Sequence, residues 1–315
     1  MAPNDPHPPG PGGPPEGEGG PPPWINPEIQ QKIQWRDGDI VVSVPVKSGT
    51  TWTMNIVHQL RQGGDPELEC VYTQVPWIEF VPGPTATVEG LVAKIDGMPS
   101  DRRRAFKSHA GPPTLPYHAP GSGKDVKYIV VMRNPDEALA SLYPFIGAHS
   151  DQWFARWEVP KHALVKEDFA TFFDEVANPG FVGMIFGFLE SWWPHRGADN
   201  VLFMHFSDMK KDHEGSVRKI ADFLGYVPTA EQWPGILEYT SFPWMKAHQE
   251  KFEGHGLTDV PVLNSGAMVR KGKVGAARED GVTEAISGTI AAAGREIVSD
   301  GKALEWVYGG GPLPD

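Results

Sequence analysis

Three short runs of mostly apolar and β-branched residues recur along the chain, at 39–44, 127–132 and 201–206. None of them shows the strict alternation of a strand that faces water on one side. A continuous apolar run of this length is typical of a parallel strand that is buried on both faces. We therefore predict three buried strands, and the residues at 106–109 predict the end of a further short one.

Helical periodicity follows each of the three longer runs. After a turn at 45–49, apolar residues recur at helical spacing and end near two glycines, a common C-cap. After the second run, an asparagine that can cap and a proline that suits the first turn predict a helix to about Phe145. After the third run, we expect Ser207 to cap a helix that Gly225 ends. The other residues concerned are Trp52, Ile56, Leu60, Gly63, Gly64, Asn134, Pro135, Val217, Ile220 and Leu224.

Repeated strand–turn–helix units predict a three-layer α/β fold, with a central parallel sheet and helices on both of its faces. Residues 1–23 hold ten Pro and six Gly. Such a segment buries too little apolar surface to offset its ordering entropy, and we predict a disordered tail there. One domain is expected over 24–308, followed by a flexible tail at 309–315.

Charge and composition narrow the classes of partner. The chain carries 28 Lys and Arg against 40 Asp and Glu, a net charge of −12. That balance argues against nucleic acid or an acidic membrane as the main partner, although a small anionic ligand remains compatible. The single cysteine, Cys70, excludes an intrachain disulfide and Cys-rich zinc sites. The longest apolar run, at 181–189, is too short to span a bilayer, and without a visible signal sequence we expect a cytoplasmic protein.

The turn at 45–49 has the chemistry of an anion-binding loop. It joins a buried strand to a helix, so exposed backbone N–H groups and the helix dipole converge on one point. Gly49 allows close approach of an oxyanion, Lys47 adds charge, and three hydroxyls add donors. The order of residues differs from the loop of nucleotide triphosphatases, in which Lys follows the second Gly. An ordinary strand-to-helix turn is the alternative interpretation.

Residues 45–52, PVKSGTTW, resemble the P-K-S-G-T-T-W loop that binds the 5′-phosphosulfate in cytosolic-type sulfotransferases. Val46 is the departure from that pattern. The family transfers a sulfuryl group from 3′-phosphoadenosine 5′-phosphosulfate (PAPS) to a hydroxyl or amine and releases PAP. The resemblance extends from Trp24 to about Lys273. It implies that the donor is bound by Lys47, Ser48, Gly49, Thr50, Thr51 and, through adenine stacking, Trp52.

A second anchor follows the second strand. Arg133 stands at the strand's carboxyl end, where ligands of parallel sheets bind, and its planar fork suits a phosphate. Ser141 lies eight residues further on. The family's 3′-phosphate motif has the same Arg–Asn and the same spacing to Ser, so the resemblance implies that both residues hold that phosphate.

A short basic loop, Arg270–Lys271–Gly272 with Gly275, resembles the family's R-K-G-x-x-G clamp on the 3′-phosphate. The family commonly continues with Asp-Trp-Lys, whereas this chain reads Ala-Ala-Arg at 276–278, which leaves the lid contacts and the adjoining dimerisation segment open. Thr240 and Phe242 resemble residues that contact the adenosine. Phe206 stands where a Tyr is common, so one hydrogen bond to the nucleotide is expected to be absent.

His109 is the candidate general base. A lone His is more often structural, but an alcohol acceptor must lose its proton, and a neutral imidazole suits that task near neutral pH. The family's base lies in a similar Lys-Thr-His segment. Lys47 is placed to stabilise the leaving oxygen, Lys107 to add charge near the sulfuryl oxygens, and the resemblance implies that Ser141 engages Lys47 before the acceptor arrives. No metal is expected, since no motif with metal-ligand spacing accompanies the loop.

Residues 75–80 resemble the family's acceptor-side segment, which makes Trp77 and Phe80 candidate pocket walls together with Phe145. Aromatic walls favour a small apolar or aromatic hydroxyl compound as the acceptor. A homodimer is a further expectation.

Three alternatives stay open at this point. A kinase-like enzyme would need Mg²⁺ and a triphosphate, and the absent triphosphatase pattern argues against it. A nucleotide-binding protein of the same fold that has lost turnover is the second. An enzyme that uses transient sulfonation to drive elimination from an alcohol is the third.

Overall fold

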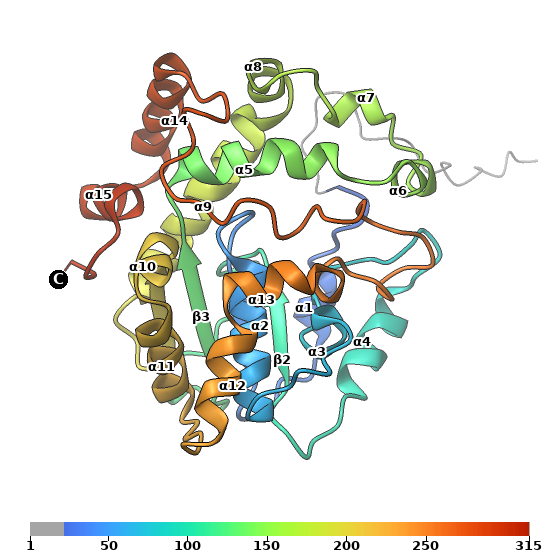
Figure 1. Cartoon of the computed structure of the whole chain (residues 1–315), viewed down its shortest axis with the longest axis vertical. Helices are drawn as coiled ribbons and strands as arrows, with labels where there is room; N and C mark the ends of the chain where they lie inside the picture. The colour runs from blue at the N-terminus through green and yellow to red at the C-terminus, as the bar shows by residue number, and fades with distance from the viewer. Residues whose placement is uncertain (1–21, 315) are drawn as a thin grey trace, which may run out of the picture.

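The structure of the chain is a computed structural model that describes residues 22–314 (Figure 1). Its centre is a four-stranded, all-parallel sheet with the strand order β2–β1–β3–β4. The strands are β1 (Ile40–Ser43), β2 (Ala105–Ser108), β3 (Lys127–Met132) and β4 (Val201–His205). All four were expected from the sequence, and the residues of β3 are those predicted.

Helices surround the sheet. The amino-terminal half contributes α1 (Glu28–Lys32), α2 (Thr50–Gln62), α3 (Val71–Gln74), α4 (Val88–Asp96), α5 (Pro135–Gly147) and α6 (Asp151–Arg156). The middle adds α7 (Lys161–Leu164), α8 (Phe169–Phe172), the kinked segment η1 (Phe173–Phe181), α9 (Val182–Trp192) and the single turn η2 (Trp193–His195). The remainder contains α10 (Phe206–Lys211), α11 (His213–Leu224), α12 (Gln232–Tyr239), α13 (Phe242–Ala247), η3 (Gln249–Phe252), α14 (Glu284–Ile297) and α15 (Gly301–Gly309).

The two faces of the sheet are covered by separate apolar cores. Alternate strand residues point to opposite sides: Val41 and Val130 pack into one core, and Val42 and Val131 into the other. The first core takes in apolar residues of α5, α9, α14 and α15, and the second those of α2, α11 and α12. This arrangement, visible in Figure 1, confirms the predicted three-layer α/β fold.

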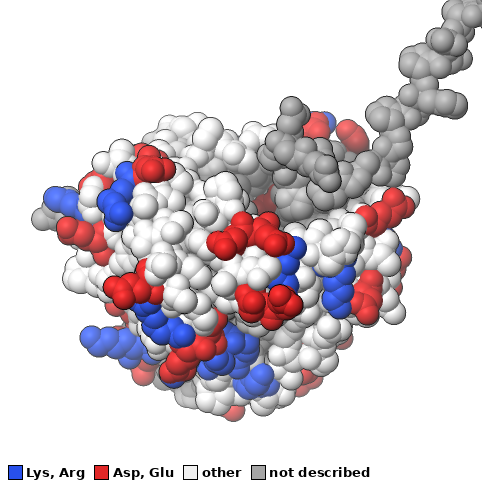
Figure 2. Space-filling view, turned by 90° about the horizontal axis from the view of Figure 1, so that it is seen from above, with Lys and Arg blue, Asp and Glu red and all other residues white. Residues whose placement is uncertain are grey.

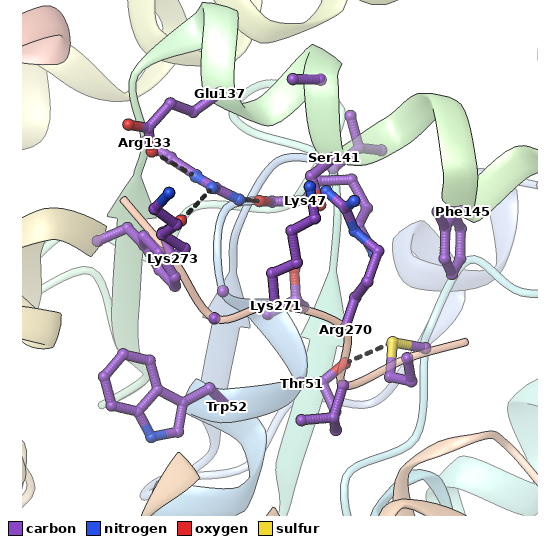
Figure 3. A pocket seen from close by; sticks show the side chains of 18 of the residues that line it. Lys47, Thr51, Trp52, Arg133, Glu137, Ser141, Phe145, Arg270, Lys271 and Lys273 are labelled. Atoms are coloured by element: carbon purple, nitrogen blue, oxygen red, sulfur yellow. Dashed lines mark hydrogen bonds and ion pairs between the residues drawn. The ribbon is translucent and has the colours of Figure 1, made fainter. Parts of the chain in front are cut away.

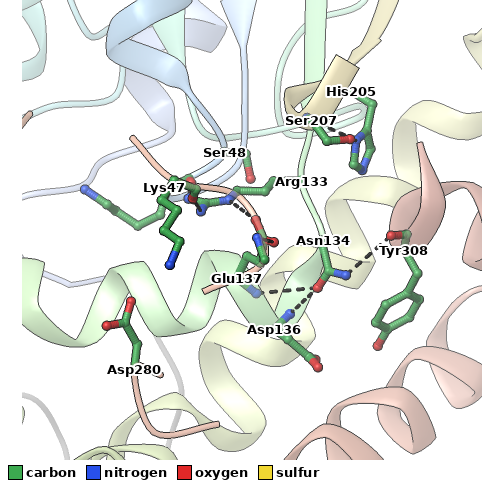
Figure 4. A network of polar contacts seen from close by, with 12 residues as sticks. Lys47, Ser48, Arg133, Asn134, Asp136, Glu137, His205, Ser207, Asp280 and Tyr308 are labelled. Carbon is green, nitrogen blue, oxygen red and sulfur yellow. Dashed lines mark hydrogen bonds and ion pairs between the residues drawn. The ribbon is translucent and has the colours of Figure 1, made fainter. Parts of the chain in front are cut away.

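Local sequence signals fix the helix ends next to the site. Gly63 adopts a left-handed conformation and caps α2. The Asn134 side chain accepts the backbone N–H groups of Asp136 and Glu137 (Figure 4), and Pro135 occupies the first turn of α5. Helix α5 continues to Gly147, beyond the predicted end at Phe145.

The prediction that Ser207 caps one helix after β4 is wrong. Two helices follow: α10 begins at Phe206, directly after His205, and the His205 ring accepts the Ser207 N–H. Asp212 then leaves helical geometry and caps α11 through the Gly215 N–H. Asp favours such caps because its carboxylate competes for backbone donors. Gly225 ends α11 as expected.

The single domain expected over 24–308 stays a prediction, and the structure shows how the chain ends. Helix α15 runs to Gly309, and the Gly311 N–H donates a hydrogen bond of 2.7 Å to Asp208, so the first residues of the predicted tail at 309–315 contact α10. The flexibility of that tail stays a prediction. The tail predicted at 1–23 lies outside the described residues except for its last two.

Surface charge is mixed rather than segregated. On the face seen in Figure 2, acidic and basic side chains of the described residues lie side by side, with broad uncharged areas between them. Within residues 22–314, no helix is both long and apolar enough to cross a bilayer.

Candidate active site

A cavity of about 200 Å³ lies at the carboxyl ends of the strands, between α2, α5, α13 and the loop at 267–277 (Figure 3). It brings together most of the residues that the sequence singled out. Those that line it are Lys47, Gly49, Thr50, Thr51, Trp52, Lys107, His109, Arg133, Ser141, Phe145, Phe242, Arg270, Lys271 and Gly272. The lining does not include Ser48, Trp77, Phe80 or Thr240.

The loop after β1 is held in a conformation that few sequences can adopt. Lys47 has φ 57° and Gly49 has φ 99°. A side chain at position 49 would meet the Phe206 ring at 2.8 Å, so only glycine fits both the backbone angle and the space. Ser48 is buried, and its hydroxyl donates to the Val46 carbonyl at 3.4 Å. The loop therefore presents its backbone, rather than the Ser48 hydroxyl, at the start of α2, which is the geometry of an anion nest.

The side chain of Lys47 lines the cavity in surroundings that disfavour its positive charge. Its ammonium lies 3.9 Å from the centre of the Phe145 ring. Desolvation, together with the positive charges of Arg133 and Arg270, lowers the pKa of Lys47 to about 7. Such a crowded group gains strongly from an anionic ligand, because the ligand replaces the repulsion with attraction.

Arg133 joins three segments of the cavity wall. Its guanidinium pairs with Glu137 at 3.2 Å and donates to the backbone carbonyls of Lys47 at 3.1 Å and Lys273 at 3.4 Å (Figures 3 and 4). It also lies over the Phe206 ring, 4.6 Å from its centre. Ser141 follows two turns later on α5 and lines the same cavity. The predicted pair of anion ligands is therefore brought together.

The basic clamp is neutralised by carboxylates that the sequence analysis did not single out. Arg270 pairs with Asp280 at 2.9 Å, and Lys271 contacts the same carboxylate. Burial opposes ionisation of Asp280, but hydrogen bonds from Arg270 and Lys271 hold its pKa below the usual value. Glu137 accepts the Gly275 N–H. In the structure these two carboxylates therefore take up bonding capacity that a phosphate could use.

The opposite end of the cavity is built on Trp52. Its indole N–H donates to the Thr240 carbonyl at 2.8 Å, while the Thr240 hydroxyl is buried and donates to Ile236. Thr240 thus orients Trp52 and does not face the cavity itself. Lys210 of α10, which we did not predict, lines this end, with its ammonium 5.0 Å from the centre of the Phe242 ring. Lys210 lies in the last turn of α10, the helix that follows β4, and this position close to a strand end could have marked it as a site candidate.

His109 stands where β2 ends and has a defined tautomer. Its Nδ1 lies 2.6 Å from the Val44 carbonyl oxygen. A carbonyl only accepts, so Nδ1 carries the proton and Nε2 keeps its lone pair. Desolvation, reinforced by Lys107 and Lys47, holds the pKa of His109 well below its ordinary value. The imidazole is therefore a neutral base at pH 7.

Lys107 is almost fully buried beside that base. Its ammonium lies 3.5 Å from the centre of the Trp77 ring. Burial lowers its pKa to about 7; Glu79 counteracts this effect and Lys47 adds to it. A cation at this point would meet negative charge that develops beside His109.

The aromatic residues predicted for the acceptor side form two layers. Phe145 lines the cavity, whereas Trp77 and Phe80 stack on each other at 5.1 Å behind Lys107 and His109. Two lining residues that the sequence analysis missed, Tyr72 and Met268, complete the apolar wall. They lie in segments without a recognisable motif.

The sequence comparisons all point to sulfotransferases. A model of the sulfotransferase domain matches residues 37–300. Sulfotransferase 2A2 of Mus musculus is 28% identical over 258 residues, covering 79% of this chain and 80% of the relative. The 3-alpha-hydroxysteroid sulfotransferase of Cavia porcellus is 29% identical over 260 residues, covering 80% and 81%.

Solved structures show the same fold. Mouse sulfotransferase SULT7A1 complexed with PAP superposes with a TM-score of 0.66 at 22% identity, covering 89% of this chain and 90% of that one. Retinol dehydratase, in complex with androsterone and inactive cofactor PAP, superposes with a TM-score of 0.62 at 20% identity, covering 87% and 84%.

Among residues 22–314, no three His, Cys, Asp or Glu side chains gather as a metal site.

Proposed function

Because this chain belongs to the sulfotransferase family and is a PAPS-dependent sulfotransferase, we propose that it sulfonates the hydroxyl of a small apolar or aromatic acceptor, with His109 as the general base. The single observation that carries this proposal is the orientation of His109. The bond from Nδ1 to the Val44 carbonyl leaves the lone pair of Nε2 available in the cavity that Lys47 and Arg133 also line.

The positive charges that line the cavity support binding of the donor. PAPS carries a phosphosulfate and a separate 3′-phosphate. The nest at 47–51 with Lys47 supplies one anion site, and Arg133, Ser141 and the clamp at 270–272 supply the other. Trp52 offers a flat face between them and α10. We expect the sulfuryl end at Lys47 and Lys107, because His109 lies at that end.

The proposed step is an in-line displacement at sulfur. His109 takes the proton of the acceptor hydroxyl at Nε2, and the acceptor oxygen forms its bond to sulfur as the bond from sulfur to the phosphate oxygen breaks. Lys47 stabilises the charge that grows on that leaving oxygen, and Lys107 that on the sulfuryl oxygens. PAP then leaves, and the imidazolium returns its proton to solvent.

The lining next to His109 supports an apolar acceptor. Val46, Tyr72, Phe145 and Met268 surround this end of the cavity. The similarity to a 3-alpha-hydroxysteroid sulfotransferase, and to retinol dehydratase in its complexes with androsterone and with retinol, agrees with a lipophilic alcohol. Such compounds gain about 25 cal/mol for each Å² of apolar surface that the wall covers.

The test is a screen of alcohols and phenols with PAPS, read by mass spectrometry. We expect products that have gained one SO₃ unit, and the same spectra would reveal an elimination product. Calorimetry with PAP and with ATP–Mg²⁺ accompanies the screen. A preference for ATP–Mg²⁺, or PAP binding without any product across the screen, would contradict the proposed activity.

Replacing Asp280 with Asn is expected to tighten PAP binding by about 1.5- to fivefold, since ion pairs near the surface contribute roughly 0.2–1 kcal/mol. The change leaves Arg270 and Lys271 free for the phosphate. Calorimetry at two salt concentrations measures it, because the gain shrinks as salt screens the charges. Glu279→Gln, which removes the exposed partner of Lys273, is the control and should change PAP affinity less. Weaker binding by the Asp280 variant would show that the carboxylate orders the clamp instead.

A further inference from the structure

A buried carboxylate, Glu79, lies directly behind the reacting groups and has no role in the mechanism above. It belongs to the segment after α3, which runs beside β2. The Ile78 N–H donates to the Lys107 carbonyl at 3.0 Å, and the Lys107 N–H donates to the Pro76 carbonyl at 2.9 Å. The segment thus extends the sheet past β2 and delivers Glu79 to the point where that strand ends.

Glu79 holds two consecutive residues of the strand end. Its Oε1 accepts the backbone N–H of His109 at 2.5 Å and lies 3.2 Å from the Ser108 hydroxyl. The side chain is 3% exposed, so these bonds form away from water. A charge-assisted bond in such a place is stronger than a neutral one. Together with the Val44 bond at Nδ1, it fixes both the backbone and the ring of His109.

Glu79 also acts on the charge of Lys107. The titratable groups around this ammonium are Glu79, Tyr72, Lys47 and His109. Of the two that affect the pKa of Lys107, Glu79 raises it and Lys47 lowers it. No hydrogen bond or ion pair to the Lys107 ammonium is present among the described residues, and the aromatic face of Trp77 is its immediate contact. The segment that carries Glu79 pairs with the backbone of Lys107, so an ionised Glu79 favours a charged Lys107.

Burying the Glu79 carboxylate lowers the stability of the folded protein, so stability does not explain its presence. Burial raises the pKa of Glu79, while the His109 N–H, Trp77 and Lys107 oppose that shift. Its Oε2 is buried and accepts no hydrogen bond of normal geometry within the described part of the chain, although the Trp77 indole lies near enough to the carboxylate to favour its charged form. Unsatisfied buried carboxylates are rare and destabilising, and they concentrate where their charge is used.

We propose that Glu79 is a positioning residue for the sulfuryl transfer: it anchors the strand end that carries His109 and acts as the buried counter-charge of Lys107. The inference rests on the proposed role of His109 as the base. Glu79 touches neither donor nor acceptor, since it is not part of the cavity lining. It acts through Lys107 on β2 and through His109, which follows the strand.

The decisive variant is Glu79→Gln. Its amide oxygen still accepts the His109 N–H, but the charge is removed, so the pKa of Lys107 falls further. We expect kcat to fall about tenfold and the alkaline limb of the pH–rate profile to move roughly one pH unit lower. Calorimetry in buffers of different ionisation enthalpy should show that the part of the proton uptake on PAP binding that belongs to Lys107 is largest at a lower pH than in the wild type. Glu79→Ala, which also loses the His109 anchor, should lower kcat further.

Glu253→Gln is the matched control, because Glu253 is equally buried, accepts one backbone N–H and has an Oε2 that accepts no hydrogen bond among the described residues, with His255 Nε2 3.5 Å away. It should leave the alkaline limb in place. A Glu79→Gln profile that overlays the wild type, or one that changes only as much as that of Glu253→Gln, would overturn the proposal. If the wild type itself transfers no sulfuryl group, or if His109→Ala stays fully active, the proposed function fails instead, and the calorimetric proton uptake still tests Glu79.

Discussion

Replacing His109 with Ala is expected to lower turnover by about two to four powers of ten, the usual contribution of a general base. The Nε2 lone pair would be lost, and no other described imidazole lines the cavity. PAP affinity should stay within about twofold, since the nest and Arg133 remain. Initial rates with a saturating acceptor, together with PAP calorimetry, measure the two effects separately.

Two comparisons sharpen this test. His162→Ala, on the exposed helix α7, should leave turnover unchanged. Added imidazole should restore part of the turnover of His109→Ala, because the missing side chain leaves room beside the acceptor. If His109→Ala retains wild-type turnover, His109 has no part in the proton transfer. A variant that loses turnover and PAP binding together would show a structural role.

The strands could be predicted because they are buried on both faces. Under that condition a run such as Lys127–Met132 is buried and mostly apolar after its first residue and is short, and few other structures suit it. Strand order could not be predicted, because β1 pairs with β2 across a separation of more than sixty residues. The division of the predicted helix into α10 and α11 at Asp212 was also missed. One polar residue inside a helical pattern is common, and whether it caps a new helix depends on how the two helices pack.

Several residues that line the cavity could be singled out from the sequence because the signals that mark them are local. Lys47 and Gly49 lie in one loop, and the spacing of Arg133 and Ser141 follows from one strand and one helix. The carboxylates Glu79 and Asp280 were missed, since nothing in a sequence says which acidic residues will fold against cations. The motifs in the sequence mark the cationic groups that would attract the donor. The fold also places carboxylates beside these cations, Glu79 near Lys107 and Asp280 beside Arg270.

Replacing Lys47 with Met is expected to lower turnover by about two to three powers of ten, the usual effect of removing one group that stabilises developing charge. Methionine keeps an apolar stem against Phe145 and leaves the Lys47 carbonyl in place for Arg133. Single-turnover rates with saturating PAPS measure the loss. Lys127→Ala, at the opposite end of β3, is the control and should leave the rate unchanged.

The pH dependence of donor binding gives this prediction a second, independent readout. In the free protein the pKa values of Lys47 and Lys107 are both about 7, and a bound anion raises them because it favours the charged forms. Binding at pH 8 should therefore take up protons, and PAP affinity should fall as the pH rises above 7. Lys47→Met should abolish part of this uptake and leave the part that belongs to Lys107. Unchanged proton uptake in that variant, or an affinity that does not depend on pH between 7 and 9, would mean that Lys47 does not meet the donor as a cation.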